Sequence, residues 1–325
     1  MEIISDKQKY FELIKDFEYI PVTQSEGWYD FHAYKNPERI IFIVDALDNP
    51  AIACFAHVKK FLHLKMLQIE GEATIRKTMT SKQIQLFYRE ITNLGYDFIE
   101  TNSQAIYNPE YEIGIRKAGY LRPVGLFSTH LSVLVDLNKA LTLSSNWEKN
   151  LKIASRQKFS FEVVELIQEK HIQEFLSQYK TLLNDKKFDF QLNKDQISQL
   201  LTDQSFGLAN IKDEEDSIIA CFVFYKHEKY AESIFRTKKD SARKTGATFF
   251  LYVKLLDFLR KNGVEYFDMG RITPGNKSKD GVADFKTGIK GALIIYNGEW
   301  SWYKKPLYRP LMYFVKKYLF NRNEL

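Results

Sequence analysis

The sequence predicts an α/β (α+β) protein built from two units that share one order of helices and strands. Two internal echoes indicate the duplication. One is a helix, a glycine and a strand, FYREITNLGYDFIE in the first half and DFLRKNGVEYFDM in the second; the other is a strand with an ACF core, AIACFAHV and IIACFVFY. Because the same elements surround both echoes, a repeated unit explains them better than chance strand composition does.

The first half begins with two short helices and continues with strands. Apolar residues at helical spacing predict a helix over Asp6 to Phe17, and TQSEGWYDFHAY predicts a second one. Three strands follow, then a helix capped by Thr80 or Ser81, a strand at YDFIET, a helix near PEYEIGIRKAG and a strand at FSTHLSVLVDL. We place the first domain at residues 1–143, which leaves 144–303 for the second.

The second half repeats this order. After the helical NWEKNLKIASRQK and two further helices, the strands FGLANIKD, SIIACFVFYK and KYAESIFR precede an apolar helix, GATFFLYVKLLDFLRKNG, and the strand VEYFDM. Each half resembles the GNAT acyltransferase fold in its element order, so two tandem GNAT-like domains are expected. No stretch sustains the heptads of a coiled-coil hairpin.

The aromatic and basic sequence over residues 304–325 predicts a C-terminal helix. Tyr308, Leu311, Met312, Val315 and Leu319 form an apolar stripe, which predicts that the helix packs back onto the first domain. A basic amphipathic helix on a membrane surface is the alternative.

Composition indicates a globular protein with a mixed surface. Apolar residues make up 45% and aromatic residues 15%, and 47 basic against 41 acidic residues give a net charge of +6. That charge permits an anionic partner without demanding one. Cys54 and Cys221 lie in apolar strands, as buried thiols do, and the charged N-terminus lacks an apolar signal core. We expect a cytoplasmic location, with the inner membrane face left open.

A long polar loop dominates the stretch from Val264 to Trp300. It follows the strand that ends at Asp268, and it contains glycines alternating with the cations Arg271, Lys277, Lys279 and Lys286. Such a backbone suits an anionic ligand, although a mobile, solvated loop is an equal alternative. A second anion site is predicted where Arg243, Lys244 and Gly246 open the apolar helix, because free amides at a helix start favour phosphate. The position resembles the coenzyme A pyrophosphate loop of GNAT enzymes.

The segments FDMGRITPG, GVADFKTGIKG and IIYNGEW, with PVTQSEGWYDF near the N-terminus, resemble the signature of the FemABX family. The resemblance implies transfer of an aminoacyl group from aminoacyl-tRNA to an amine of a peptidoglycan precursor. It also implies that Lys286, with Phe285 beside it, faces the tRNA end and the developing charge. Relatives carry an acidic residue beside proline that is the candidate partner of the attacking amine. That residue is absent from this sequence, and Glu100 is the carboxylate nearest to its position.

The resemblance further implies cations that bind the phosphates of the precursor. His32 and Lys35 follow Trp28, and Lys186 and Lys187 precede Phe188, so these four are the candidates for the acceptor site. None aligns cleanly with the family pattern, and a solvated surface charge is the alternative for each.

Three functions remain open from the sequence. The first is a FemABX-type aminoacyltransferase that uses aminoacyl-tRNA and a nucleotide- or lipid-linked muropeptide. The second is an N-acyltransferase that uses acetyl-CoA, and the third is a module that binds a glycan or nucleotide without catalysis. No metal-ligand spacing and no bound cofactor are predicted.

Overall fold

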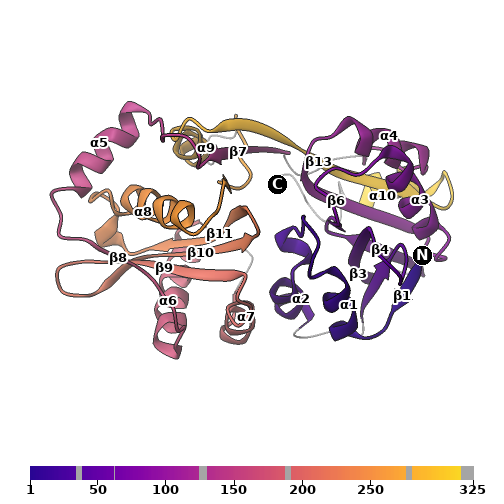
Figure 1. Cartoon of the computed structure of the whole chain (residues 1–325), viewed down its shortest axis with the longest axis horizontal. Helices are drawn as coiled ribbons and strands as arrows, with labels where there is room; N and C mark the ends of the chain where they lie inside the picture. The colour runs from indigo at the N-terminus through magenta and orange to yellow at the C-terminus, as the bar shows by residue number, and fades with distance from the viewer. Residues whose placement is uncertain (34–38, 62, 124–129, 187–191, 276–279, 316–325) are drawn as a thin grey trace. The chain divides into compact units, whose positions relative to one another are not determined.

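The computed structural model describes the chain except residues 34–38, 62, 124–129, 187–191, 276–279 and 316–325. Its contacts divide the chain into two compact units (Figure 1). The first comprises Met1–Tyr29, Lys35–Leu131 and Ile294–Leu325, and the second comprises Asp30–Tyr34 and Ser132–Leu293. Each unit contains a sheet covered by helices.

The sheet of the first unit has one parallel pair among antiparallel neighbours. Its strands run in the order β1 (Glu2–Ile4), β2 (Ile40–Val44), β3 (Ile52–Phe61), β4 (Leu64–Ile69), β6 (Phe98–Ile106) and β13 (Ala292–Tyr303), with β5 (Ala73–Thr74) beside β3. Among the strand pairs of the described residues of this unit, only β4 and β6 are parallel, which requires a crossover between them. The crossover is helix α3 (Ser81–Thr92).

Helix α3 covers this sheet together with α4 (Pro109–Lys117). It begins at a capping box in which Thr80 and Gln83 exchange hydrogen bonds, as the sequence predicted. Its apolar face and Tyr111 and Ile115 of α4 pack on Ile69 and Ile99 in the core of the sheet. The other helices of the unit are α1 (Lys7–Ile14), the short η1 (Val22–Gln24) and α2 (Glu26–Ala33), which ends in the second unit.

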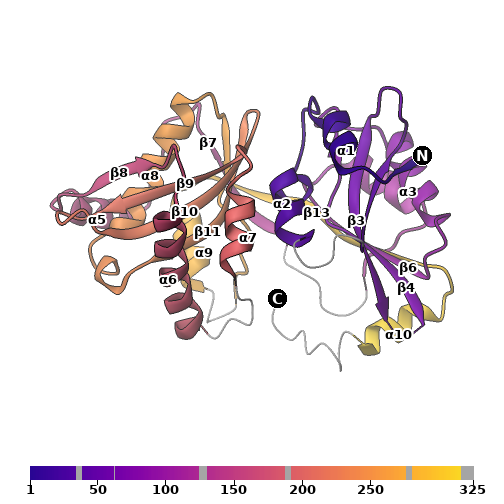
Figure 2. The same cartoon turned by 90° about the horizontal axis from the view of Figure 1, so that it is seen from below.

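Helix α10 (Tyr308–Phe314) closes the described chain. Its Met312 and Val315 pack on Phe98 of β6, and Met66 of β4 lies against the same cluster. Figure 2 shows α10 beside β4 and β6. The helix is therefore held to the first unit by one apolar face.

The second unit repeats this sheet. Its strands run in the order β7 (Leu131–Asp136), β12 (Tyr266–Asp268), β11 (Tyr230–Lys238), β10 (Ile218–His227), β9 (Phe206–Lys212) and β8 (Ser160–Val163). Within the part of this unit that the structure describes, again only one pair, β11 with β12, is parallel. The crossover is α8 (Ala247–Lys261), which lies with α5 (Ser145–Ala154) on one face of the sheet (Figure 1). Helices α6 (Glu169–Lys186) and α7 (Lys194–Leu200) cover the other face; η3 (Asp240–Ala242) precedes α8.

The last strand of each sheet comes from the other half of the sequence. The predicted boundary at 143/144 assigns β7 to the first domain and all of β13 to the second. In the structure β7 pairs with β12, where Asp136 lies opposite Tyr266, and β13 pairs with β6, where Tyr303 lies opposite Phe98. Local patterns predict that a strand exists, but its partner depends on contacts far away in sequence.

Two smaller predictions concern the cysteines and the membrane. Cys54 on β3 and Cys221 on β10 are buried free thiols, as expected. Among the described residues, no helix has the length and apolar character that crossing a membrane requires.

Candidate active site

In the second unit, β11 and β12 separate after their last residue pair, Glu232 and Asp268, and we call this position the fork. The two strands pair over three residue pairs, from Tyr230 opposite Tyr266 to Glu232 opposite Asp268. Strand β12 ends at Asp268, whereas β11 continues to Lys238. Because paired residues of neighbouring strands point to the same face, Glu232 and Asp268 bring two carboxyl groups together at the fork.

Asp268 is fully buried, and three donors hold its carboxylate. The Gly270 amide donates to Oδ1 at 2.7 Å and the Tyr230 hydroxyl to Oδ2 at 2.8 Å, while the Ser132 hydroxyl also donates to Oδ1. A buried carboxylate requires such donors because it has lost its hydration. Asp268 therefore fixes the turn at Gly270 as the chain leaves the strand.

Lys286 lies against this turn. It belongs to α9 (Asp280–Thr287), and its Nζ donates a hydrogen bond of 3.0 Å to the main-chain oxygen of Arg271. A Cβ atom on Gly270 would lie 3.1 Å from the same nitrogen, and the φ angle of Gly270 is +79°. Glycine at 270 therefore favours the left-handed backbone and leaves room for the close approach of the lysine.

The electrostatic environment of the fork shifts the pKa values of two groups toward neutral pH. Burial, together with the positive charge of Arg236, lowers the pKa of Lys286 to about 8, although Asp268 and Glu232 oppose the shift. Burial and the nearby Asp268 raise the pKa of Glu232, against the effect of Arg271 and Lys286. Groups that exchange protons in this range are suited to acid–base chemistry.

Phe285 anchors the helix that carries Lys286. Its ring lies 4.9 Å from that of Trp147 and 5.1 Å from that of Tyr252, and the Trp147 indole donates to its main-chain oxygen at 2.8 Å. Arg236 lies 4.8 Å from the same ring and donates to the Tyr252 hydroxyl at 3.0 Å. Phe285 thus packs in an aromatic cluster, while its neighbour Lys286 is presented to the fork.

The structure separates the donor residues predicted from the sequence. Arg271 lies at the fork, and Lys277 and Lys279 fall outside the described residues. Arg243, Lys244 and Gly246 lie at the start of α8, where Arg243 pairs with Asp240 at 2.7 Å and Lys244 is exposed.

Gly246 faces α5 within the second unit. Its φ angle is +77°, and a Cβ atom there would lie 2.3 Å from the main-chain oxygen of Asn150 on α5. The close packing of α5 on α8 therefore accounts for this glycine without an anionic ligand.

The remaining predicted residues lie elsewhere. Glu100 is half-buried on β6 of the first unit, between Gln68 of β4 and Ser301 of β13. His32 is half-buried in the last turn of α2, and Lys186 is the last residue of α6. Lys35 and Lys187 fall outside the described residues.

The corresponding end of the first sheet holds a hydroxyl network instead. There the last parallel pair joins Ile69 to Thr101, and Glu72 follows three residues later. Glu72 is buried and accepts hydrogen bonds from Tyr88 at 2.6 Å and Ser103 at 3.2 Å. Burial raises its pKa to about 7, although those hydrogen bonds oppose the shift. The contacts of Glu72 are thus neutral, whereas cations surround Glu232 in the second unit.

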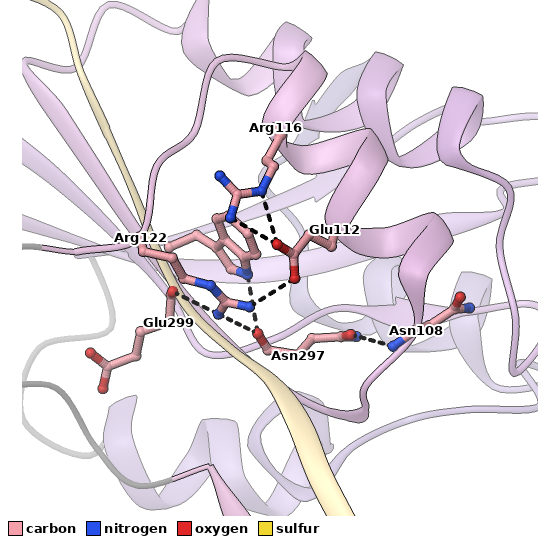
Figure 3. A network of polar contacts seen from close by, with 7 residues as sticks. Asn108, Glu112, Arg116, Arg122, Asn297 and Glu299 are labelled. Atoms are coloured by element: carbon pink, nitrogen blue, oxygen red, sulfur yellow. Dashed lines mark hydrogen bonds and ion pairs between the residues drawn. The ribbon is translucent and has the colours of Figure 1, made fainter.

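The segment IIYNGEW builds a polar network in the first unit (Figure 3). Arg116 and Arg122 both donate to Glu112, and Arg122 also donates to the main-chain oxygen of Asn297 at 2.7 Å. The Arg122 guanidinium lies 3.7 Å from the centre of the Trp300 ring. Since the register of β13 against β6 shifts between Tyr296 and Gly298, these contacts stabilise the irregular strand. This part of the signature therefore has a structural role in its own unit.

Two residues of the fork, Glu232 and Arg236, were missed from the sequence. Both stand in KYAESIFR, where two charges within a core strand were an available signal. The pairing of β10 with β11 shifts register between Val223 and Phe224, so alternation along the sequence does not give the face that each charge occupies.

Comparison with known proteins agrees with this architecture. Residues 161–317 match the sequence model of the FemAB family. The crystal structure of FemX is similar with a TM-score of 0.76 at 10% identity, covering 96% of this chain and 100% of that one. The structure of L-PGS from Bacillus licheniformis has a TM-score of 0.68 at 17% identity and covers 98% of both chains. Comparison with curated proteins finds no match.

A tandem GNAT protein from the clavulanic acid biosynthesis pathway is also similar. Its TM-score is 0.51 at 7% identity, covering 94% of this chain and 99% of that one. The prediction of two tandem GNAT-like units is thereby confirmed, as is the resemblance to the FemABX family. The chain has a tandem GNAT-like fold, and its residues 161–317 match the FemAB family.

Proposed function

We propose that the protein transfers an aminoacyl group from aminoacyl-tRNA to an amine of a peptidoglycan precursor, and that the fork of the second unit is the transfer site. The proposal rests on the proximity of the Lys286 amino group to the carboxyl groups of Glu232 and Asp268, where the parallel strands β11 and β12 separate. The family match over residues 161–317 supports the reaction class.

The proposed reaction begins when the acceptor amine attacks the carbonyl carbon of the aminoacyl ester. A C–N bond forms, and the carbonyl oxygen becomes a tetrahedral oxyanion. Lys286, as an ammonium group held by the Arg271 carbonyl, is placed to stabilise that charge. The C–O bond to the ribose then breaks, and the amide is released from the tRNA.

Glu232 is the proposed proton carrier. The attacking amine must lose a proton and the departing ribose oxygen must gain one, so a single group that accepts and then returns a proton balances the step. The raised pKa of Glu232 favours such exchange near neutral pH, whereas three donors keep Asp268 fixed. Phe285 acts through packing, as the anchor of α9.

The test is a transfer assay with purified protein. Total charged tRNA and nucleotide-linked muropeptide should yield a muropeptide extended by one amino acid, detected by mass spectrometry. The product should disappear in Lys286→Ala and persist in Lys254→Ala, because Lys254 is exposed on α8. If no charged tRNA gives product with nucleotide-linked or lipid-linked muropeptide, the proposal is wrong.

Acetyl-CoA is the alternative donor, and the start of α8 is its proposed binding site. That reading is weakened by Gly246, since packing against Asn150 accounts for the glycine. A donor that binds the folded state raises its melting temperature by mass action. Millimolar acetyl-CoA should leave the melting temperature unchanged if aminoacyl-tRNA is the donor, and a shift that is lost in Arg243→Ala/Lys244→Ala would favour the alternative.

A cytoplasmic location fits both proposed substrates and stays a prediction. The acceptor-site roles of His32, Lys35, Lys186 and Lys187 stay proposals as well, and alanine variants that raise the KM for muropeptide without changing the KM for aminoacyl-tRNA would support them.

A further inference from the structure

Helix α10 has two apolar faces, and one of them is exposed. Met312 and Val315 pack on Phe98 of the first unit. Leu307, Leu311 and Phe314 are spaced at i, i+4 and i+7, so they share a different face. Their exposed fractions are 75%, 39% and 56%. Single exposed apolar residues are ordinary, but three on one helix face form a contiguous surface.

Cations gather around this face. Lys304 and Lys305 are exposed immediately before α10. The main-chain amide of Lys304 donates to the carbonyl of Asp97, which holds this lysine next to the start of β6. Figure 2 shows α10 beside β4 and β6.

We propose that the Leu307–Leu311–Phe314 face of α10, with Lys304 and Lys305 beside it, docks on the surface of an anionic phospholipid bilayer. An amphipathic helix binds such a surface by burying its apolar face at the level of the headgroups, while its cations attract the lipid phosphates. The apolar face favours lipid over nucleic acid, because a polyanion would engage the lysines without needing exposed leucine.

This inference does not rest on the proposed transfer reaction. It requires no membrane-spanning helix, in agreement with the helices described. The residues involved lie in the first unit, outside the fork that carries Lys286.

The test is sedimentation of the full chain with vesicles of phosphatidylglycerol and phosphatidylcholine, against vesicles of phosphatidylcholine alone. Leu307→Ser probes the apolar face, and Leu166→Ser is its control, since Leu166 is 72% exposed in the second unit. Lys304→Glu/Lys305→Glu probes the charge, with Arg76→Glu/Lys77→Glu as the control from exposed cations of the first unit. Uncharged tRNA is added as a competitor, and melting curves verify that each variant is folded.

The proposal expects binding to the anionic vesicles only. Leu307→Ser should weaken the partition coefficient about tenfold, as loss of a buried leucine does. Lys304→Glu/Lys305→Glu reverses two charges, a change of four charge units, and should weaken it by about fivefold for each unit. Both controls should bind as the wild type does. Absence of binding to anionic vesicles would overturn the proposal. So would binding that is insensitive to Leu307→Ser and is displaced by tRNA, because that result identifies a nucleic-acid surface.

Discussion

Lys286 donates a hydrogen bond of 3.0 Å to the main-chain oxygen of Arg271. This contact connects α9, which carries Phe285 and Lys286, to the loop that follows β12. The lysine approaches so closely because residue 270 is glycine. Three separate parts of the signature segment, Asp268, Gly270 and Lys286, therefore form one arrangement. Its parts are testable one at a time.

Replacement of Gly270 by alanine should reduce both stability and transfer. A left-handed backbone costs an ordinary residue about 1–2 kcal/mol, and the added methyl group would also displace the Lys286 amino group. Gly263→Ala is the matched control, because its φ angle is +82° and nothing lies within 4 Å of the added carbon. Urea unfolding and transfer rates should show a similar loss of stability in both variants and a loss of activity in Gly270→Ala alone.

The pH dependence of transfer should report the titration of Lys286. Its lowered pKa, about 8, means that the ammonium form is lost as pH rises through 8, so kcat/KM should fall on the alkaline side. Arginine stays charged throughout this range, and Lys286→Arg should remove that alkaline fall if it retains activity. An unchanged alkaline fall in an active Lys286→Arg variant would show that another group titrates there.

Replacement of Glu232 by glutamine should slow transfer by about 10²- to 10⁴-fold, the usual contribution of a positioned proton carrier. The folded state should be as stable as the wild type or more so at pH 8, because burial and Asp268 disfavour the charge that glutamine removes. Rates and urea unfolding curves measured on the same preparations separate the two effects. Glu265→Gln, at the opposite end of the β11–β12 pair and paired with Lys229, should keep full activity.

The first unit should become less stable as pH rises toward 7. Burial raises the pKa of Glu72 to about 7, so the folded state holds its proton while the unfolded chain, with a pKa near 4.5, has already lost it. The contribution is fully present below about pH 4.5, and on the order of 3 kcal/mol is lost by pH 8. Urea unfolding at both pH values should show this difference shrinking in Glu72→Gln; an equal pH dependence in both proteins would assign it to other groups.

The sequence predicted most of the elements, because their local signals were strong. Thr80 and Gln83 mark the start of α3, and the repeated ACF strands both became buried core strands with the cysteines inside. The order of helices and strands was sufficient to predict two tandem GNAT-like units. The exchange of β7 and β13 between the sheets was not predictable in this way, since strand pairing depends on distant residues.

The candidate site was predicted only in part. The glycine-rich loop indicated Arg271, and the resemblance to the FemABX signature indicated Lys286. Both residues lie at the fork. Glu232 and Arg236 reach it from β11, a strand about fifty residues earlier, and a register shift between β10 and β11 hides their orientation from the sequence. Gly246 shows the opposite case, where a glycine that suggested a phosphate site is explained by helix packing.

The central claim is that Lys286 stabilises charge during transfer at the fork. The most direct measurement is the single-turnover rate at which labelled amino acid moves from preloaded tRNA to muropeptide, for the wild type, Lys286→Ala and Lys254→Ala. The account predicts a loss of roughly 10²- to 10³-fold in Lys286→Ala alone, as removal of a group that stabilises an oxyanion produces. A folded Lys286→Ala protein that transfers at the wild-type rate would contradict it.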